Sequence, residues 1–329
     1  MIPQAPRQPI SRERLSEIRN MKPKRDWVQI LGSAFGSWGF CAIFGGSVMD
    51  CCASFVVGLL LWIFLLKVTS QHFTKLLGNI INGGFVALLC FICWKLGFGQ
   101  NFGNMIVGSL IPLIPGVAFT NGIRDIANED YLAGTTRLLD AILVFAAIAI
   151  GACFFFVISG HINGGYILLN GALSDGFTSG IIFQTMAAFI GTVGFAVLFG
   201  CPSEEYVWCG IAGTFAWISY LALVRYASFS VFESTLVSSF LTAVLARRLS
   251  IFRKCPNTVY LLTGLFPLIP GGGIFWTTYY LCSQQLHQAM QSGITALSVA
   301  FAIVLGIVMV LGIPRQFRFP YRKNFSQKS

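Results

Sequence analysis

The chain has 329 residues, of which 55% are hydrophobic and only 10% are charged, whereas a soluble domain has about 25% charged residues. The mean hydropathy is +0.74, and the apolar runs are too long and too numerous for two soluble domains of this total length. The composition therefore excludes a soluble globular protein and indicates an integral membrane protein. The net charge of +10 does not indicate a nucleic-acid partner, because the basic residues lie between the apolar runs and at the chain ends.

A membrane-spanning helix needs about 20 mostly apolar residues. Ten stretches of the chain meet this requirement and predict an all-α protein with about ten transmembrane helices. In chain order they are 28–47, 51–67, 76–96, 103–120, 136–158, 177–199, 205–224, 229–246, 257–281 and 291–313. The first stretch follows a polar, arginine-rich segment and reads as an uncleaved signal anchor.

The basic residues predict the orientation of these helices, because they mark the cytoplasmic side of a membrane protein. With the N-terminus inside, all of the 22 Lys and Arg residues fall on the cytoplasmic side except Lys95 and Arg225. An odd number of helices would scatter them over both sides. We therefore predict that both termini are cytoplasmic, with a polar tail at 1–27 and a basic tail at 314–329.

The chain contains an internal repeat with an offset of 155 residues. The sequence Pro-Leu-Ile-Pro-Gly starts at Pro112 and again at Pro267. Further pairs align at this offset without a gap: Gln29 with Gln184, Gly36 with Gly191, Asp50 with Glu205, Gly58 with Gly213, and Trp62 with Trp217. Each repeat, 28–160 and 176–313, holds five helices, so the second crosses the membrane in the opposite direction. This predicts a 5+5 inverted repeat, an architecture found in many secondary transporters.

Each repeat interrupts its fourth helix with two prolines and a glycine, so helices four and nine are predicted to be broken. The residues are Pro112, Pro115 and Gly116 in the first repeat, and Pro267, Pro270 and Gly271 in the second. Matching breaks in two halves of a transporter indicate the substrate site. The half-helices that follow would start near the membrane midplane, face one another, and direct free N–H groups at an anion such as a carboxylate. Simple proline kinks that only shape the packing are the alternative.

Four polar residues follow the first break, namely Thr120, Asn121, Arg124 and Asp125. The last three lie within about one helical turn and are expected to line the cytoplasmic approach to the break. Thr120 or Asn121 could instead cap a helix, and Arg124 could form a loop ion pair with Asp125 or Asp130. The second repeat has only uncharged polar residues at this place, so the first repeat is expected to supply the ion chemistry.

Two acidic residues inside predicted helices are candidates to carry a coupling proton together with Asp125, because an ionisable residue within a membrane helix is a functional hypothesis by default. Asp140 lies one to two turns into the fifth helix, and an intrahelical ion pair with Arg137 is the alternative role for it. Glu233 lies in the eighth helix and could instead mark its outer boundary. The remaining acids are interpreted as loop residues: Asp50, Asp175, Glu204 and Glu205.

Cysteine and histidine residues do not predict a metal or catalytic site. Most of the ten cysteines lie in apolar runs, where they act as packing residues, and the Cys-x-x-Cys spacing at 90–93 lies mid-helix without a partner pair. The three histidines are scattered. No metal, cofactor or catalytic residue is expected. The small residues Gly32, Gly36 and Gly39 predict close packing of one helix against another.

The sequence PLIPGVAFTNGIRDIANEDYLAGTTRLLDA (112–141), with FGGSVMD (44–50) before it, resembles the first membrane half of the threonine/serine exporter family. The sequence LFPLIPGGGIF (265–275) resembles the second-half module of that family, and the chain resembles the fused form from about residue 12 onward. The family usually has a longer soluble region before the first helix, and here we expect only a short tail. The resemblance implies proton-driven export of threonine and serine, while split-chain relatives are linked to dicarboxylates such as succinate. The family motif positions are Pro112, Pro115, Gly116, Asn121, Arg124, Asp125, Gly134, Arg137 and Asp140.

Together these observations predict a secondary transporter of the inner or plasma membrane, and not an enzyme. It is expected to export small amino acids by alternating access at a midplane site, with proton coupling. The expected partners are the small-molecule substrate, protons and the lipid bilayer, with a homo-oligomer left open and no nucleic acid. A dicarboxylate exporter is the main alternative, and a channel is a less favoured one.

Overall fold

The computed structural model describes residues 25–127, 129–163 and 180–312, and the regular structure within them is entirely helical, as predicted. The helices of the first part are α2 (Asp26–Ile43), α3 (Val48–Phe64), α4 (Ser70–His72), α5 (Lys75–Lys95), α6 (Phe102–Leu110), α7 (Gly116–Ala127) and α8 (Tyr131–Asn163). Those of the second part are α9 (Ile181–Leu198), α10 (Tyr206–Tyr226), α11 (Val231–Arg253), α12 (Asn257–Leu265), α13 (Gly271–Cys282) and α14 (Leu286–Leu311). The two predicted tails lie outside the described residues except for 25–27, where α2 already begins.

Among the described residues, fewer helices have the length and hydropathy of a membrane span than the ten predicted. Among the described residues, seven helices are long and apolar enough to cross a membrane, and two bent helix pairs raise this number to nine. The helix α2, which we expected to be the first span, is not among them. Its 18 residues include Asp26, Gln29 and a series of glycines and serines, most of which are buried. Because these small residues pack against protein, α2 does not need the hydropathy of a lipid-facing helix.

The helix bounds recur along the chain at the 155-residue offset of the sequence repeat. α2 and α9 start at 26 and 181 and end at 43 and 198, and the pairs α6/α12 and α7/α13 obey the same offset at both ends. The duplication seen in the sequence is therefore also a duplication of local structure.

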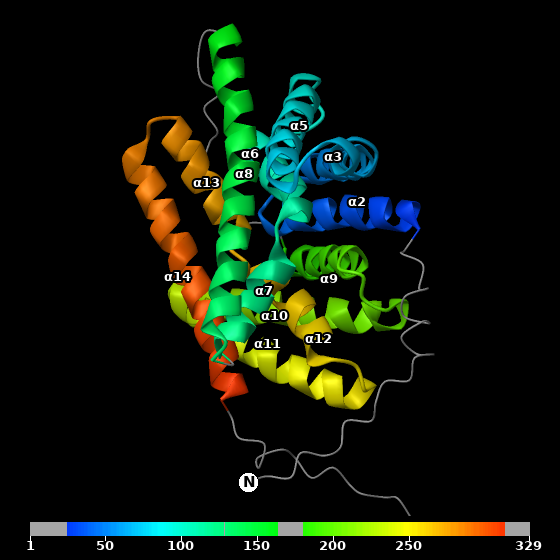
Figure 1. Cartoon of the computed structure of the whole chain (residues 1–329), viewed down its shortest axis with the longest axis vertical. Helices are drawn as coiled ribbons and strands as arrows, with labels where there is room; N and C mark the ends of the chain where they lie inside the picture. Colours follow the sequence, from blue (N-terminus) through cyan, green and yellow to red (C-terminus); the bar gives the residue numbers. More distant parts are fainter. Residues whose placement is uncertain (1–24, 128, 164–179, 313–329) are drawn as a thin grey trace, which may run out of the picture.

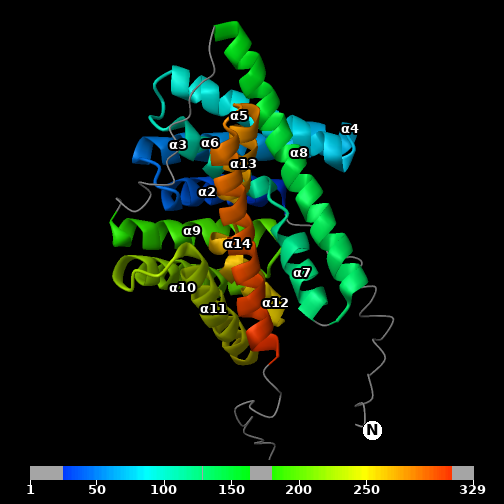
Figure 2. The same cartoon turned by 90° about the vertical axis from the view of Figure 1, so that its left-hand side faces the viewer.

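The two parts of the chain form two groups of helices that meet at α2 and α9. Figures 1 and 2 show α2 and α9 side by side, with α3, α5 and α6 beyond α2 and with α10, α11 and α12 beyond α9. The helices α8 and α14 run along the long axis of the molecule past both groups. Between the groups lies a central apolar cluster in which Phe195 packs against Phe40 and Phe266, with ring centroids 5.0 and 4.0 Å apart.

The helix that follows each break packs with the opposite group. Ile123 of α7 lies in the apolar core formed by α9, α10, α11, α12 and α14. In return, Phe275, Trp276 and Tyr279 of α13 lie in the core formed by α3, α5, α6 and α8. Each break is thus the point at which the chain crosses from its own group to the other.

Glycines bring α2 and α9 into close contact, as the small residues of α2 predicted. A Cβ atom added at Gly39 would lie 2.5 Å from Cα of Gly191, and one added at Gly194 would lie 2.6 Å from the carbonyl oxygen of Gly32. Backbones can approach this closely only where side chains are absent. The contact is reciprocal, because Gly36 and Gly39 of α2 occupy the repeat positions of Gly191 and Gly194.

Candidate functional site

The two proline motifs produce true breaks, as predicted. After α6 the chain makes a 3₁₀ turn (Ile111–Leu113), and after α12 it makes the corresponding turn at Phe266–Leu268. Ile114 and Ile269 then have extended backbones, with ψ of 128° and 130°. Each precedes a proline, and the proline ring disfavours the helical conformation of the residue before it. The two pairs of half-helices are bent by 64° and 43°.

The two breaks face one another. A Cβ atom added at Gly116 would lie 2.5 Å from the ring of Phe266, in the second break. A Cβ atom added at Gly271 would overlap the side chain of Ile114, in the first break. Each half-helix therefore begins with a glycine because the opposite break leaves no room for a side chain.

A cavity of about 280 Å³ lies against the second break. Its walls come from the break itself, from α10, α11 and α14, and from the end of α2. The lining residues are Ile43, Phe44, Trp217, Tyr220, Val231, Thr235, Pro267, Leu268, Ile269, Pro270, Gly272, Gly273, Thr295, Ala296 and Val299. The predicted site residues Pro267 and Pro270 thus form part of a cavity wall.

The residues that line this largely apolar cavity carry polar groups of two kinds. Gly272 and Gly273 lie in the first turn of α13, where their N–H groups precede the first bond of the helix, from Ile274 N–H to Pro270 O at 3.1 Å. Tyr220, Thr235 and Thr295 supply three hydroxyl groups. The two threonines already donate to carbonyl oxygens one turn back, so their oxygen lone pairs remain available as acceptors.

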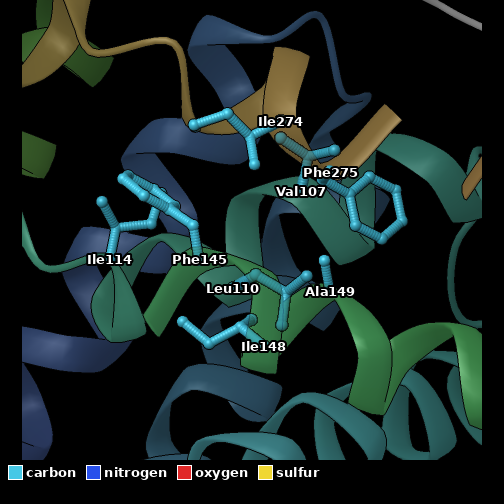
Figure 3. Close-up of a pocket in the computed structure, with 9 residues that line it drawn as sticks. Val107, Leu110, Ile114, Phe145, Ile148, Ala149, Ile274 and Phe275 are labelled. Carbon is cyan, nitrogen blue, oxygen red and sulfur yellow. The ribbon is translucent and has the colours of Figure 1, made fainter. Parts of the chain in front are cut away.

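The first break has only a small apolar pocket. Figure 3 shows Val107, Leu110, Ile114, Phe145 and Ile148 around it, together with Ala149, Ile274 and Phe275. Its volume is about 20 Å³, room for about one water molecule. Gly271 lines this pocket rather than the larger cavity. A polar ligand would find no side-chain partner among these residues, so the cavity at the second break is the better candidate site.

The charged residues predicted near the first break form ion pairs between helices. Arg137 of α8 pairs with Asp125 of α7, and Lys75 of α5 pairs with Asp140 of α8 at 2.6 Å. The alternative intrahelical pair of Asp140 with Arg137 is therefore not the one formed. The side chain of Asp140 is 47% exposed, and Arg124 is also exposed. None of these charges lines the cavity at the second break.

The remaining predicted site residues lie in three different environments. Thr120 is buried on α7, and Asn121 beside it is half-buried. Glu233 closes a capping box at the start of α11, where its carboxylate accepts the N–H of Ser230 at 2.9 Å and its own N–H donates to the Ser230 hydroxyl at 3.3 Å. Glu233 lies between Val231 and Thr235, which both line the cavity.

Two acids that we interpreted as loop residues are in fact buried and fix the structure. Asp50, which is 1% exposed, accepts the backbone N–H groups of Ser47, Gln100 and Asn101 at 2.8, 2.6 and 2.9 Å. It thereby ties the start of α3 to the start of α6.

Glu205 occupies the corresponding position of the second repeat and is 6% exposed. It accepts hydrogen bonds from Arg253 at 3.0 Å and from the Tyr260 hydroxyl at 2.6 Å, so it ties the start of α10 to the end of α11 and to α12. The prediction of loop residues was wrong for both acids. Asp50 and Glu205 align at the repeat offset, and this alignment was the sequence signal of a shared structural role. Glu204 is exposed, as expected, and Asp175 lies outside the described residues.

Comparison with known proteins agrees with the sequence resemblance. The ThrE family model of threonine/serine exporters matches residues 10–159, and the ThrE_2 model of the same exporters matches residues 184–313. The probable threonine/serine exporter of Mycobacterium tuberculosis is 21% identical over 295 residues, covering 86% of this chain and 55% of the relative. The threonine/serine exporter of Corynebacterium glutamicum is 22% identical over 255 residues, covering 75% and 50%.

The chain thus spans about half the length of the curated relatives it matches. No solved structure matches it significantly. The two family models together cover most of the chain, in the order and at the places where the two repeats lie. This chain therefore belongs to the threonine/serine exporter family and contains both modules of that family in one multi-pass membrane protein.

Proposed function

We propose that this protein is a secondary transporter that exports threonine and serine by alternating access around the cavity at the second break. The observation that carries the proposal is this cavity of about 280 Å³, whose lining includes the first turn of a half-helix and three residues that bear hydroxyl groups. The orphan N–H groups of the half-helix suit a carboxylate. The hydroxyl oxygens suit an ammonium group, which only donates hydrogen bonds.

In the transport mechanism that we propose, the two repeats cross the membrane in opposite directions. It counts α2 as a tenth crossing helix that its neighbours bury, with both termini in the cytoplasm. The reciprocal contact of α2 with α9 and the exchange of α7 and α13 between the helix groups support a two-fold relation between the halves, since such a relation makes each contact occur twice. In this orientation Tyr220, Val231 and Thr295 lie near the outer ends of their helices, so the cavity opens towards the outside.

Proton coupling would involve the carboxylates of the first repeat, with Asp125 or Asp140 as the carrier and Arg124 tuning the nearby charge. Glu233 is a further candidate, because it is an ionisable residue in the first turn of α11, the helix that supplies Val231 and Thr235 to the cavity wall. Thr120 and Asn121 would line the cytoplasmic approach, and the two breaks would form the midplane site together.

A dicarboxylate exporter is the second candidate, and the cavity argues against it. A dianion needs a second cationic group, but no Lys or Arg is among the lining residues of the cavity. Arg137 is already paired with Asp125. Counterflow into proteoliposomes separates the two candidates: with threonine loaded inside, we expect saturable uptake of labelled threonine and serine, while uptake of succinate alone would establish the dicarboxylate reading.

Replacing Thr295 with valine is expected to raise the half-saturating threonine concentration about tenfold, because a hydrogen bond to a charged ligand is lost. Thr136→Val is the matched control. Both threonines are exposed and donate to the carbonyl oxygen one turn back, at 2.9 and 2.7 Å, but Thr136 does not line the cavity. Equal counterflow in the two variants would remove Thr295 from the site.

Asp140→Asn is expected to abolish transport driven by a pH gradient while leaving folded protein and threonine counterflow. The ion pair with Lys75 is exposed on both sides, so its loss costs at most about 1 kcal/mol of stability. The control is Lys75→Gln, which breaks the same ion pair but keeps the carboxylate. Rates of gradient-driven transport equal to wild type across pH in Asp140→Asn would show that this carboxylate carries no coupling proton.

A further inference from the structure

A hydrogen bond between two buried side chains links α9 to the wall of the cavity. The indole N–H of Trp217 donates to Oε1 of Gln184 at 3.1 Å. Gln184 is fully buried and Trp217 is 7% exposed. Trp217 also lines the cavity at the second break, so this bond fixes part of the cavity wall relative to α9.

The first repeat contains the same two residue types at the corresponding positions, but the bond is not made there. Gln29 and Trp62 align with Gln184 and Trp217 at the 155-residue offset. The indole Nε1 of Trp62 is buried and has no hydrogen-bond partner among the described residues. Gln29 is half-buried, whereas Gln184 is fully buried. A buried donor without an acceptor costs free energy. The first repeat therefore lacks, at this cost, the hydrogen bond that the second repeat has formed.

The difference between the two pairs does not come from their residue types, which are identical. It lies in their surroundings, because Gln184 on α9 is fully buried whereas Gln29 on α2 is only half-buried. In a transporter with inverted repeats, the two halves exchange their conformations when access alternates between the two sides of the membrane. An interaction made in one repeat and open in the other is the signature expected of an element that takes part in this exchange.

We propose that the two Gln–Trp pairs are alternating latches of the transport cycle. The Gln184–Trp217 bond stabilises the state described here, in which the cavity at the second break is open. In the opposite state this bond opens, the Trp62 indole donates to Gln29, and the cavity closes. The inference rests on the proposed function as an alternating-access transporter, and it makes these four side chains positioning residues rather than ligands of the substrate.

The latches predict opposite effects for two equivalent substitutions, because each bond favours only one of two states and its loss shifts the population towards the other. Trp217→Phe removes a bond of the present state and favours the closed cavity. Trp62→Phe removes an unsatisfied donor from the present state and a bond from the opposite one, so it favours the open cavity. Each shift is expected to be about fivefold, the effect of one hydrogen bond.

Access to the cavity can be measured with a cysteine at Ala296, which is buried at 5% exposure and lines the cavity. The variant Ala296→Cys would be placed in nanodiscs and labelled with a membrane-impermeant maleimide. The rate would be read on the peptide that carries residue 296, so that the ten native cysteines do not interfere. We expect Trp217→Phe to slow labelling about fivefold, Trp62→Phe to accelerate it about fivefold, and the double variant to return close to the starting rate.

Trp27→Phe is the matched control, because Trp27 is 56% exposed and should leave the labelling rate unchanged. Equal rates in the two latch variants, or shifts of the same sign, would overturn the proposal. If Trp217→Phe does not fold, Trp62→Phe decides alone, since its indole has no bond to lose in this state and an unchanged rate would contradict the latch. Threonine, serine and succinate counterflow by the same variants in proteoliposomes separates the latch from the substrate assignment: counterflow with unchanged labelling refutes only the latch, whereas opposite labelling shifts without counterflow refute only the substrate assignment.

Discussion

Replacing Gly151 with leucine is expected to prevent α8 from packing against α5 and to destabilise the protein by at least about 4 kcal/mol, the range of severe core substitutions. A Cβ atom at Gly151 would overlap the backbone carbonyl of Ile80, and one at Gly83 would overlap that of Ile148. The clash is with backbone on both sides, so no side chain can rotate to relieve it and the two helices must separate. The apolar core that α8 shares with α3, α5, α6 and α13 would open as a result.

The expected result is loss of the monodisperse peak in size-exclusion chromatography of the detergent-solubilised protein. Gly180→Leu is the matched control, because a Cβ atom there meets nothing within 4 Å. Gly151→Ala should give an intermediate loss of thermal stability. A Gly151→Leu protein with the elution profile and denaturation temperature of wild type would show that α5 and α8 are not packed at this contact.

The second large effect is expected from Glu205→Ala, which should lower the free energy of unfolding by about 3 kcal/mol. Removing one partner of a buried ion pair costs about 3–5 kcal/mol, and the side chain of Arg253, which is 32% exposed, can recover part of this by turning to solvent. The fully buried Tyr260 cannot do so, and its hydroxyl loses its 2.6 Å acceptor. Arg253 also lies over the ring of Trp208, at 5.6 Å, so the junction of α10, α11 and α12 depends on this cluster.

Glu204→Ala supplies the control, because Glu204 is the exposed neighbour of the buried acid and its loss should be neutral. Glu205→Gln keeps an acceptor for Tyr260 but loses the charge, so its effect should lie between the two. Heat-induced unfolding of the purified protein would rank the three variants. Equal denaturation temperatures for Glu204→Ala and Glu205→Ala would contradict the buried role of Glu205.

Much of the fold could be predicted from the sequence because its signals are local. Apolar length predicts helices, and proline acts on its own residue and the one before it. The breaks after Leu113 and Leu268 therefore lie where the sequence placed them. The repeat offset is also present in the structure, since the helix pairs α2/α9, α6/α12 and α7/α13 have bounds that match at the 155-residue spacing. Small residues likewise indicated that α2 packs closely against another helix, and the structure identifies this helix as α9.

The candidate site could be predicted only in part. Pro267 and Pro270 do line the cavity, but Tyr220, Thr235 and Thr295 were not recognised. A threonine hydroxyl in a membrane helix usually bonds its own backbone and gives no sequence signal, and Tyr220 is one of nine tyrosines without a motif around it. The ion partners also differed from those expected. Asp140 pairs with Lys75, which is 65 residues away in the sequence. Sequence spacing cannot reveal a contact between two helices that are this far apart along the chain.

The sequence by itself determined that this is a helical membrane protein of two repeated parts with a break in each, because burial in lipid constrains composition, length and backbone hydrogen bonding along the chain. Only the tertiary structure decided which residues the breaks bring together. It placed a cavity at one break and a small apolar pocket at the other, buried Asp50 and Glu205, and formed the Gln184–Trp217 bond while leaving Trp62 unpaired. The physical reason is that packing between helices distinguishes positions that the repeated sequence makes equivalent.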